Sequence, residues 1–219
     1  MKSIFKKIAA GIIFSSMAPL AAAGIIYSND FQANANGFAG FTTVQTATNG
    51  EGFLGFINDG DLPTLELSGL TGYHTINIEF DVIGFRSLDG TTNMDYFSLE
   101  ADGSELFKDF YGHNGWKSEI TGPATGVLVS HDISGDTLGY GNYFGGASIY
   151  HYSLSVAKAN TTSSMSLAFF GNANQQWQDE AFGLDNLKIT AVPEPTALAL
   201  LGLGLAGVGF SRRIRKTKS

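Results

Sequence analysis

The segment from residue 73 to residue 85 reads Tyr73-His-Thr-Ile76-Asn-Ile78-Glu-Phe80-Asp-Val82-Ile-Gly-Phe85 and decides the fold class. Along it, apolar side chains alternate with polar ones: Ile76, Ile78, Phe80 and Val82 against Thr75, Asn77, Glu79 and Asp81. A period of two residues is typical of a β-strand with one face buried and the other in water. The segment therefore predicts a long, half-buried strand.

Other segments of the chain repeat this alternation, in Tyr150–Val156 and in Met165–Phe169. The turn sequence Asp102-Gly103-Ser104 separates two apolar runs and predicts a β-hairpin. Residues 24–192 contain no sustained apolar stripe with the 3.6-residue period of a helix. Many short strands, each with one apolar face, predict an all-β domain: a two-sheet antiparallel β-sandwich, or jelly roll, over residues 24–191.

Charge is distributed unevenly along the chain. Residues 24–192 contain five Lys or Arg and nineteen Asp or Glu, a formal charge of −14, although the whole chain carries −7. Such an acidic domain repels phosphate backbones, which excludes nucleic acid as a partner, while its carboxylates can attract divalent cations. The absence of cysteine excludes disulfides, thiol catalysis and Cys-ligated metals.

The first 23 residues have the three regions of a secretory signal peptide. Lys2, Lys6 and Lys7 precede the apolar stretch Ile8–Phe14, and three alanines at 21–23 provide small residues for cleavage before Gly24. We therefore predict an N-terminal signal helix, removed on export.

The last residues, 192–219, have a different composition from the domain. Pro193-Glu194-Pro195 is followed by a 14-residue apolar run, Ala197–Phe210, that includes Leu201 and Leu205, and then by a basic cluster with Arg212, Arg213 and Arg215. As a helix the run extends about 21 Å, short of the ~30 Å hydrocarbon core, so its flanks must reach the interfaces. The pattern predicts a short C-terminal transmembrane helix with its basic end retained inside the cell.

This tail resembles the PEP-CTERM sorting tail of Gram-negative bacteria that make exopolysaccharide. The resemblance implies a temporary anchor in the inner membrane that an exosortase-type protease recognises and cuts. The protein would then reach the cell surface or the extracellular matrix. The alternative is an ordinary membrane anchor that is never cut.

Motifs within the domain are similar to those of exported bacterial β-sandwich modules and carbohydrate-binding jelly rolls. They are Phe80-Asp81-Val82, Ser87-Leu88-Asp89-Gly90, Asp95-Tyr96-Phe97, the final Asp179–Ile189 segment, and the opening Ser28–Gln32. The chain departs from these patterns at Leu88, where Trp is usual, and at Gln32, where Glu is usual.

In those jelly rolls an acid of the first strand and an Asp of the last strand bind structural calcium. The resemblance implies ligands at Asp30, Gln32, Asp179, Glu180 and Asp185. Because Asp185 shares the phase of Leu187 and Ile189, its carboxylate is expected on the core side, where it needs a cation or several donors. The alternative is that Asp185 accepts hydrogen bonds from local backbone N–H groups.

Three loop-like clusters combine aromatic rings with amides, the composition of saccharide-binding surfaces. The expected contact residues are Trp116, Tyr140, Tyr143 and Trp177. The alternative is that these rings cover the ends of the sandwich. Glu100, Asp102 and Glu105 fit a glycosidase string, but the intervening turn would place the glutamates on different strands.

We therefore expect an exported, non-enzymatic protein of the cell surface or matrix. Exopolysaccharide is the candidate ligand of its aromatic clusters, and calcium is the structural ion that the resemblance implies. A glycan-active hydrolase of the β-sandwich type and a purely structural matrix protein are the alternatives.

Overall fold

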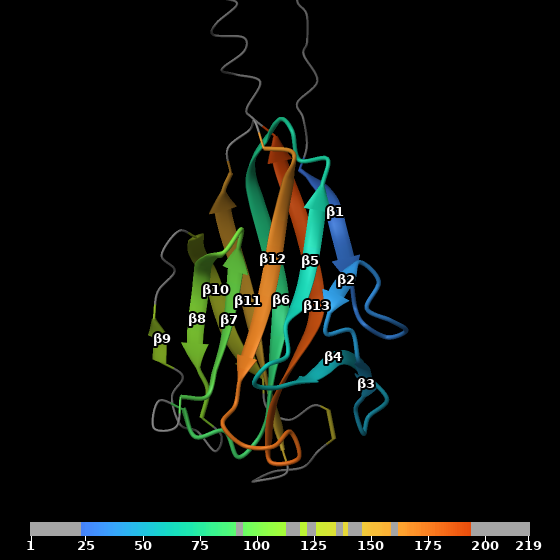
Figure 1. Cartoon of the computed structure of the whole chain (residues 1–219), viewed down its shortest axis with the longest axis vertical. Coiled ribbons are helices and arrows are strands. Elements are labelled where there is room, and N and C mark those ends of the chain that lie inside the picture. The colour runs from blue at the N-terminus through green and yellow to red at the C-terminus, as the bar shows by residue number, and fades with distance from the viewer. Residues whose placement is uncertain are drawn as a thin grey trace, which may run out of the picture. The chain divides into compact units, whose positions relative to one another are not determined.

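The computed structural model describes residues 23–90, 94–112, 119–121, 126–134, 138–139, 146–158 and 162–193. The strands among them form two antiparallel sheets (Figure 1). The first sheet has the order β10-β11-β6-β13-β4-β3, with β1 also paired to β13. Its strands are β1 (Gly24–Asn29), β3 (Val44–Thr46), β4 (Gly52–Ile57), β6 (Tyr73–Arg86), β10 (Gly126–Ser134), β11 (Ala147–Ala157) and β13 (Glu180–Pro193).

The second sheet has the order β2-β5-β12-β7-β8-β9. Its strands are β2 (Phe38–Gly40), β5 (Pro63–Ser68), β7 (Tyr96–Ala101), β8 (Ser104–Phe110), β9 (Glu119–Thr121) and β12 (Ser164–Asn172). The two sheets confirm the predicted all-β sandwich.

The main core lies between the sheets. Ile76, Ile78, Phe80 and Val82 of β6 are buried there with apolar residues of β7, β8, β11 and β12, as the alternation predicts. The predicted hairpin is also confirmed: Ala101 pairs with Ser104, and Asp102 and Gly103 have φ angles of 49° and 75°. Positive φ at both turn residues matches the right-handed twist of the flanking strands.

A second apolar cluster covers part of the outer face of the first sheet. Phe85 and Ile83, which follow Val82 in β6, are buried there with Phe53 of β4, Leu138 and Ala147. The sequence predicts apolar faces on one side only, but here part of the outer face of the sheet is apolar as well. The reason is that Phe53 of β4 and Leu138 supply side chains that pack on the outer face.

The last strand of the sandwich, β13, ends at Pro193. Val192 and Pro193 extend β13 and pair with Thr75 and Tyr73 of β6. The predicted signal peptide, 1–23, and the predicted transmembrane helix lie outside the described residues apart from residue 23. None of the described segments forms a helix long and apolar enough to cross a membrane.

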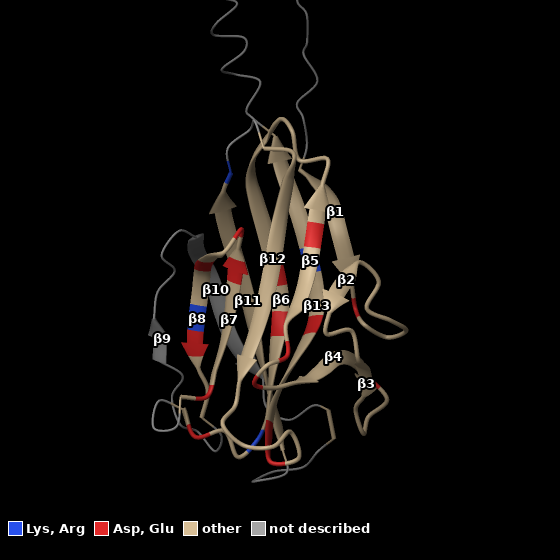
Figure 2. Cartoon of the chain, viewed as in Figure 1, with Lys and Arg blue, Asp and Glu red and all other residues tan. Residues whose placement is uncertain are grey.

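Acidic side chains are spread over both sheets and over the loops, with few basic ones between them (Figure 2). Carboxylates gather in two separate groups. One group lies on the outer face of the first sheet, and the other lies at an end of the sandwich. Together with the surface around Trp177, they are the candidate functional features.

Candidate functional site

Trp177 lies on the loop between β12 and β13, and 46% of its surface is exposed. One face of its indole stacks on Phe56 of β4, with ring centroids 5.4 Å apart and an interplanar angle of 19°. Phe56 in turn contacts Phe53 and Phe85, the aromatic rings of the second cluster. We call Trp177 and Phe56 the aromatic platform; a buried layer supports it from below.

The end of β6 holds the loop in place. Arg86 Nη1 donates a hydrogen bond to the carbonyl of Trp177 at 2.9 Å, and its guanidinium carbon lies 5.5 Å from the Phe56 centroid and 6.0 Å from that of Trp177. Ser87 Oγ donates to Asp179 Oδ1 at 2.9 Å. Cation–π contact and hydrogen bonds together fix the indole at an exposed position.

A hollow of about 230 Å³ opens beside the platform. Its lining combines aromatic rings with a hydroxyl, an amide and a carboxylate: Phe41, Thr43, Gln45, Phe56, Asp61 and Trp177. Aromatic faces with a few polar groups at the rim are what sugar recognition requires. The hollow is smaller than the ~300–1,000 Å³ pockets that enclose drug-sized ligands. It therefore suits contact with part of a ligand that otherwise stays in solvent.

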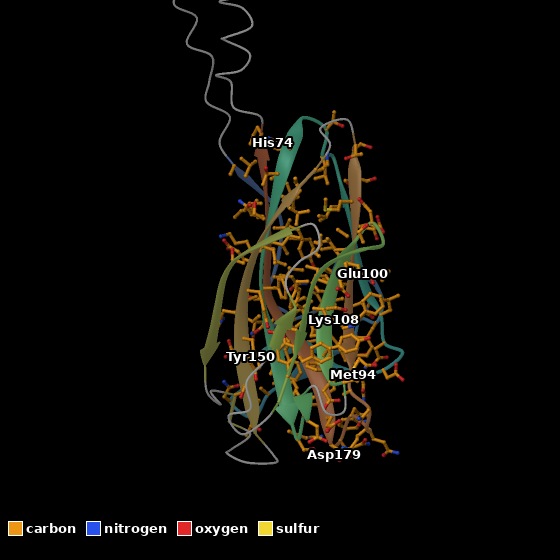
Figure 3. The ribbon with its side chains drawn as sticks, turned by 90° about the vertical axis from the view of Figure 1, so that its left-hand side faces the viewer. His74, Met94, Glu100, Lys108, Tyr150 and Asp179 are labelled. Carbon is orange, nitrogen blue, oxygen red and sulfur yellow. The ribbon has the colours of Figure 1, made fainter. Side chains whose placement is uncertain are left out.

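A second hollow of about 260 Å³ shares Asp61 with the first. Its other lining residues are Asp59, Gly60, Leu62, Tyr96, Phe170, Gly171 and Asn172. Lys108, labelled in Figure 3, holds its Nζ 3.6 Å from the centroid of the Tyr96 ring. The loop bearing Asp61 therefore borders both hollows.

Of the predicted ligand-binding residues, the structure places Trp177 at the surface, as expected from its polar surroundings. Trp116, Tyr140 and Tyr143 lie outside the described residues. Sequence reasoning missed Phe56 and Arg86, because only the pairing of β4, β6 and β13 brings them to Trp177.

Asp185 lies on the outer face of the first sheet, and the expectation that it points to the core side is wrong. It pairs with Asp81 of β6, whose neighbours in sequence, Phe80 and Val82, point into the core. The register shifts after Asp185, and Asn186 has a φ of 48°. This bulge reverses the alternation of side chains along the strand, so that Leu187 points into the core while Asp185 points to the outer face.

Asp185 is nevertheless buried beside other acids. Asn186 donates its backbone N–H to Asp185 Oδ1 at 2.7 Å, as the alternative interpretation expects, and its Nδ2 to Asp81 Oδ2 at 2.8 Å. His151 Nδ1 lies 2.6 Å from Asp81 Oδ1. Burial raises the pKa of Asp185 to about 7, and the charge of Asp81 acts in the same direction.

The structure does not bring the predicted calcium ligands to one point. Gln32 uses its amide oxygen to accept the backbone N–H of Gly52 at 3.1 Å, and its own backbone N–H donates to Asp30 Oδ1 at 3.2 Å. Glu180 lies five residues before Asp185 on β13, which corresponds to about 16 Å along a strand. Calcium at Asp185 stays a prediction, but Glu180 belongs to a different cluster.

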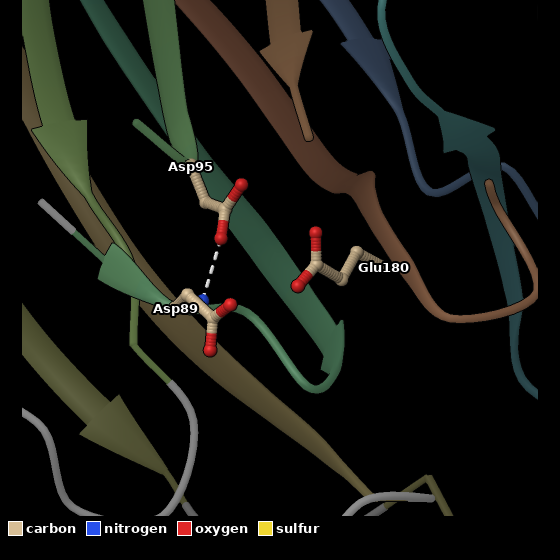
Figure 4. A group of neighbouring side chains, drawn as sticks. All are labelled: Asp89, Asp95 and Glu180. Atoms are coloured by element: carbon tan, nitrogen blue, oxygen red, sulfur yellow. Dashed lines mark hydrogen bonds between the residues drawn. The ribbon is translucent and has the colours of Figure 1, made fainter. Parts of the chain in front are cut away.

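That cluster consists of Asp89, Asp95 and Glu180, which each offer a carboxylate oxygen within 4.8 Å of the other two (Figure 4). Burial raises the pKa of Glu180 to about 7, with repulsion from Asp95, Asp89 and Asp179 adding to the effect. Burial also raises the pKa of Asp95. The sequence contained the residues of this cluster in three of its motifs but nothing that assigned them a common role.

The glycosidase string is divided by the hairpin, as expected. Glu100 of β7 and Glu105 of β8 are cross-strand partners at the surface of the second sheet (Glu100 is labelled in Figure 3). Neither residue lines either of the two hollows described above. Asp102 accepts the backbone N–H of Ser166 at 2.8 Å, a structural role.

Comparison with known proteins identifies the tail. Residues 191–216 match the family described as the PEP-CTERM protein-sorting motif, which confirms the predicted resemblance and implies an exported protein of a Gram-negative bacterium. The match begins within the last three residues of β13. None of the curated proteins compared with the chain matches it.

Two solved structures similar to the chain are carbohydrate-binding modules. One is the C-terminal CBM6 of LamC, a marine laminarinase from Zobellia galactanivorans, with 16% identity, a TM-score of 0.34, and coverage of 77% of this chain and 99% of that one. The other is TmCBM27, a module that recognises mannan, with 11% identity, a TM-score of 0.38, and coverage of 78% and 99%. The assignment of a ligand rests on the site and not on these similarities.

Proposed function

We propose that this chain is a non-enzymatic protein of the cell surface or extracellular matrix whose β-sandwich binds polysaccharide at the aromatic platform. The observation that carries the proposal is the position of Trp177: nearly half exposed, yet fixed by Phe56 below it and by Arg86 beside it. A large exposed aromatic ring held in one plane is a ready surface for the apolar face of a pyranose. Binding then costs little conformational entropy, because the ring is already ordered.

The charge of the domain favours an uncharged glycan. Asp61 lines both hollows and Asp59 lines the second, and the sequence around them is strongly acidic. A polyanionic saccharide would be repelled by this field, whereas the hydroxyl groups of a neutral one can donate hydrogen bonds to carboxylates and to the amide of Gln45.

Replacing Trp177 by alanine is expected to weaken glycan binding at least about 30-fold, a loss of about 2 kcal/mol typical of a buried aromatic contact in a complex. Folding should change little, because nearly half of the residue is exposed. The measurement is a screen of the full chain, purified in mild detergent, on an array of neutral and acidic glycans, followed by calorimetric titration with the best ligand. Ile25→Ala, which shortens another exposed apolar side chain, is the matched control. Equal binding by Trp177→Ala and the parent protein would rule out the platform.

The tail is proposed to act as a temporary membrane anchor that an exosortase-type protease removes. The fold supports such processing, because the last described strand pair joins Pro193 to Tyr73. A cut beyond Pro193 would therefore leave β13 and the sandwich intact.

Replacement of both Glu194 and Pro195 by alanine is expected to leave an uncut precursor in the membrane fraction. The mass of the protein recovered from the producing cells measures this, since the mature parent protein should lack residues 1–23 and the apolar run. If the parent protein also keeps its apolar run, and so differs from the variant only by the mass of the two substitutions, the tail is a permanent anchor.

A further inference from the structure

The cluster of Asp89, Asp95 and Glu180 joins three segments that are distant in sequence. Asp89 follows β6 and forms an isolated β-bridge with Gly112, Asp95 comes directly before β7, and Glu180 is the first residue of β13. Figure 4 shows the Glu180 side chain extending from β13 toward the loop that bears the two aspartates. The three carboxylates therefore meet where the connections at one end of the sandwich converge.

Hydrogen bonds hold Asp95 rigidly in this cluster. Its Oδ2 accepts the backbone N–H of Asp89 at 2.5 Å, and its Oδ1 accepts that of Asn174 at 3.3 Å. Its own backbone is fixed by bonds to Gly90 and Tyr111. The side chain is fully buried, so the carboxylate is preorganised without help from water.

Glu180 is the member of the cluster that points to a bound ligand. Its side chain is fully buried, and Oε1 accepts a hydrogen bond from Gln175 Nε2 at 3.2 Å, but Oε2 is buried with no partner. Arg86, its partner in the strand pairing, sends its guanidinium to the carbonyl of Trp177 instead. An unpaired carboxylate oxygen, buried next to two more carboxylates, requires a positive charge.

We propose that Asp89, Asp95 and Glu180 bind a divalent cation, calcium, which ties the β6–β7 connection to the start of β13. The donors are hard oxygen atoms, which suit Ca²⁺ and Mg²⁺. Calcium fits better, because Mg²⁺ retains several waters in a strict octahedron and two of these side chains are fully buried. This site differs from the one implied by resemblance, with which it shares only Glu180.

Such an ion would also stabilise the loop that carries Trp177. Glu180 and Asp179 donate their backbone N–H groups to the carbonyl of Gln176, at 3.1 and 2.7 Å, so the turn before β13 is a compact unit. Fixing Glu180 fixes one end of that turn. The proposal itself does not depend on what Trp177 binds.

The alternative source of positive charge at Glu180 is a proton, and substitution separates the two cases. Glu180→Gln imitates a protonated carboxyl, so without metal it should be at least as stable as the parent chain. It should, however, lose the response to calcium, because a neutral amide is a poor ligand where a charged oxygen is needed.

The test measures the melting temperature of the full chain in mild detergent, first with a chelator and then with calcium or magnesium. At a calcium concentration about 100 times the Kd, we expect the parent melting temperature to rise by about 5–10 °C, and magnesium to be less effective. Glu180→Gln and Asp95→Asn should abolish the rise. Glu66→Gln, which neutralises an exposed acid on β5, should retain it.

Two results would overturn the proposal. One is a parent protein whose melting temperature and calorimetric titration do not respond to calcium. The other is a calcium response that survives in Glu180→Gln but disappears in Asp185→Asn, which would place the ion on the outer face of the first sheet. If Asp95→Asn does not fold, Asp89→Asn tests the same cluster from the more exposed side.

Discussion

Tyr152→Phe is expected to lower the free energy of unfolding by about 3 kcal/mol, although it removes a single oxygen atom. That oxygen lies between the sheets, where it donates a hydrogen bond to Asp109 Oδ2 at 2.5 Å. It also lies 2.6 Å from the hydroxyl of Tyr111. All three side chains are buried, so no solvent can replace the lost contact.

The cost comes from the carboxylate that remains. Burial raises the pKa of Tyr152, with further contributions from the charge of Asp109 and the hydrogen bond to it, and burial likewise raises the pKa of Tyr111 well above its usual value. Both phenols therefore stay protonated and available as donors. Removing the Tyr152 hydroxyl takes a short hydrogen bond from a buried carboxylate, and a buried charge that loses a partner destabilises a protein more than the bond itself contributes.

Thermal unfolding of the full chain in mild detergent measures the effect, and for a domain of this size the melting temperature should fall by about 6–12 °C. Tyr150→Phe is the matched control, because Tyr150 lies on the same strand, is also buried, and has a hydroxyl bonded to Ser148. Tyr150→Phe should lower the free energy of unfolding by about 1 kcal/mol. If the two variants unfold at the same temperature, the Tyr152–Asp109 contact does not stabilise the core.

Local patterns predicted much of the fold. The alternation in β6 and the turn at Asp102-Gly103 involve neighbours in sequence, and each agrees with the structure. Asp109 was predictable by the same logic, because it lies between Phe107 and Tyr111 at the inward phase of β8 and would therefore need donors in the core.

Features that depend on contacts between distant segments were not predictable in this way. The bulge at Asn186 places Asp185 on the outer face, and it arises where the partner of β13 changes from β4 to β1. The second apolar cluster likewise needs β4 to pack Phe53 across the face of β6. A period of two residues cannot reveal an extra residue in a strand, and it carries no information about which segment will cover a face.

The candidate sites follow the same division. Trp177 could be recognised from its polar surroundings, whereas Arg86 and Phe56, which hold it, come from strands about 90 and 120 residues earlier in the sequence. Asp89, Asp95 and Glu180 meet only because β7 and β13 begin at the same end of the sandwich.

Asp185→Asn is expected to stabilise the metal-free protein at pH 8 by roughly 2–4 kcal/mol. Folding raises the pKa of this carboxyl from its ordinary value of 3.8 to about 7, so ionisation is disfavoured in the folded chain. Burial is the main cause, and the carboxylates of Asp81, Glu51 and Asp30 add to it. Asparagine keeps an oxygen that can accept the Asn186 N–H, and removes the charge.

The pH dependence has a definite sign. Below about pH 4 the carboxyl is protonated in both the folded and the unfolded state, so the parent and the variant should be similarly stable. As the pH rises from about 4 to 7, the Asp185 carboxyl ionises in the unfolded state before it ionises in the folded state. The parent therefore loses stability that the variant keeps. The hydrogen-bonded His151 and Asp81 are present in both proteins, so the difference between the two profiles isolates residue 185.

Chemical denaturation of the full chain between pH 4 and 8, with chelator present, measures both profiles, and Asp59→Asn, which neutralises an exposed loop acid, should follow the parent. Parallel profiles for Asp185→Asn and the parent would mean that Asp185 ionises freely in the fold.

Repeating the series with calcium then tests the ion implied by resemblance. If calcium binds at Asp185, the order of stability reverses and the parent becomes the more stable protein, because the ion favours the same charge that burial opposes. If the order does not reverse, Asp185 is a buried acid whose neighbours are hydrogen-bond partners and other acids, and the cation site lies with Glu180 or nowhere among these carboxylates.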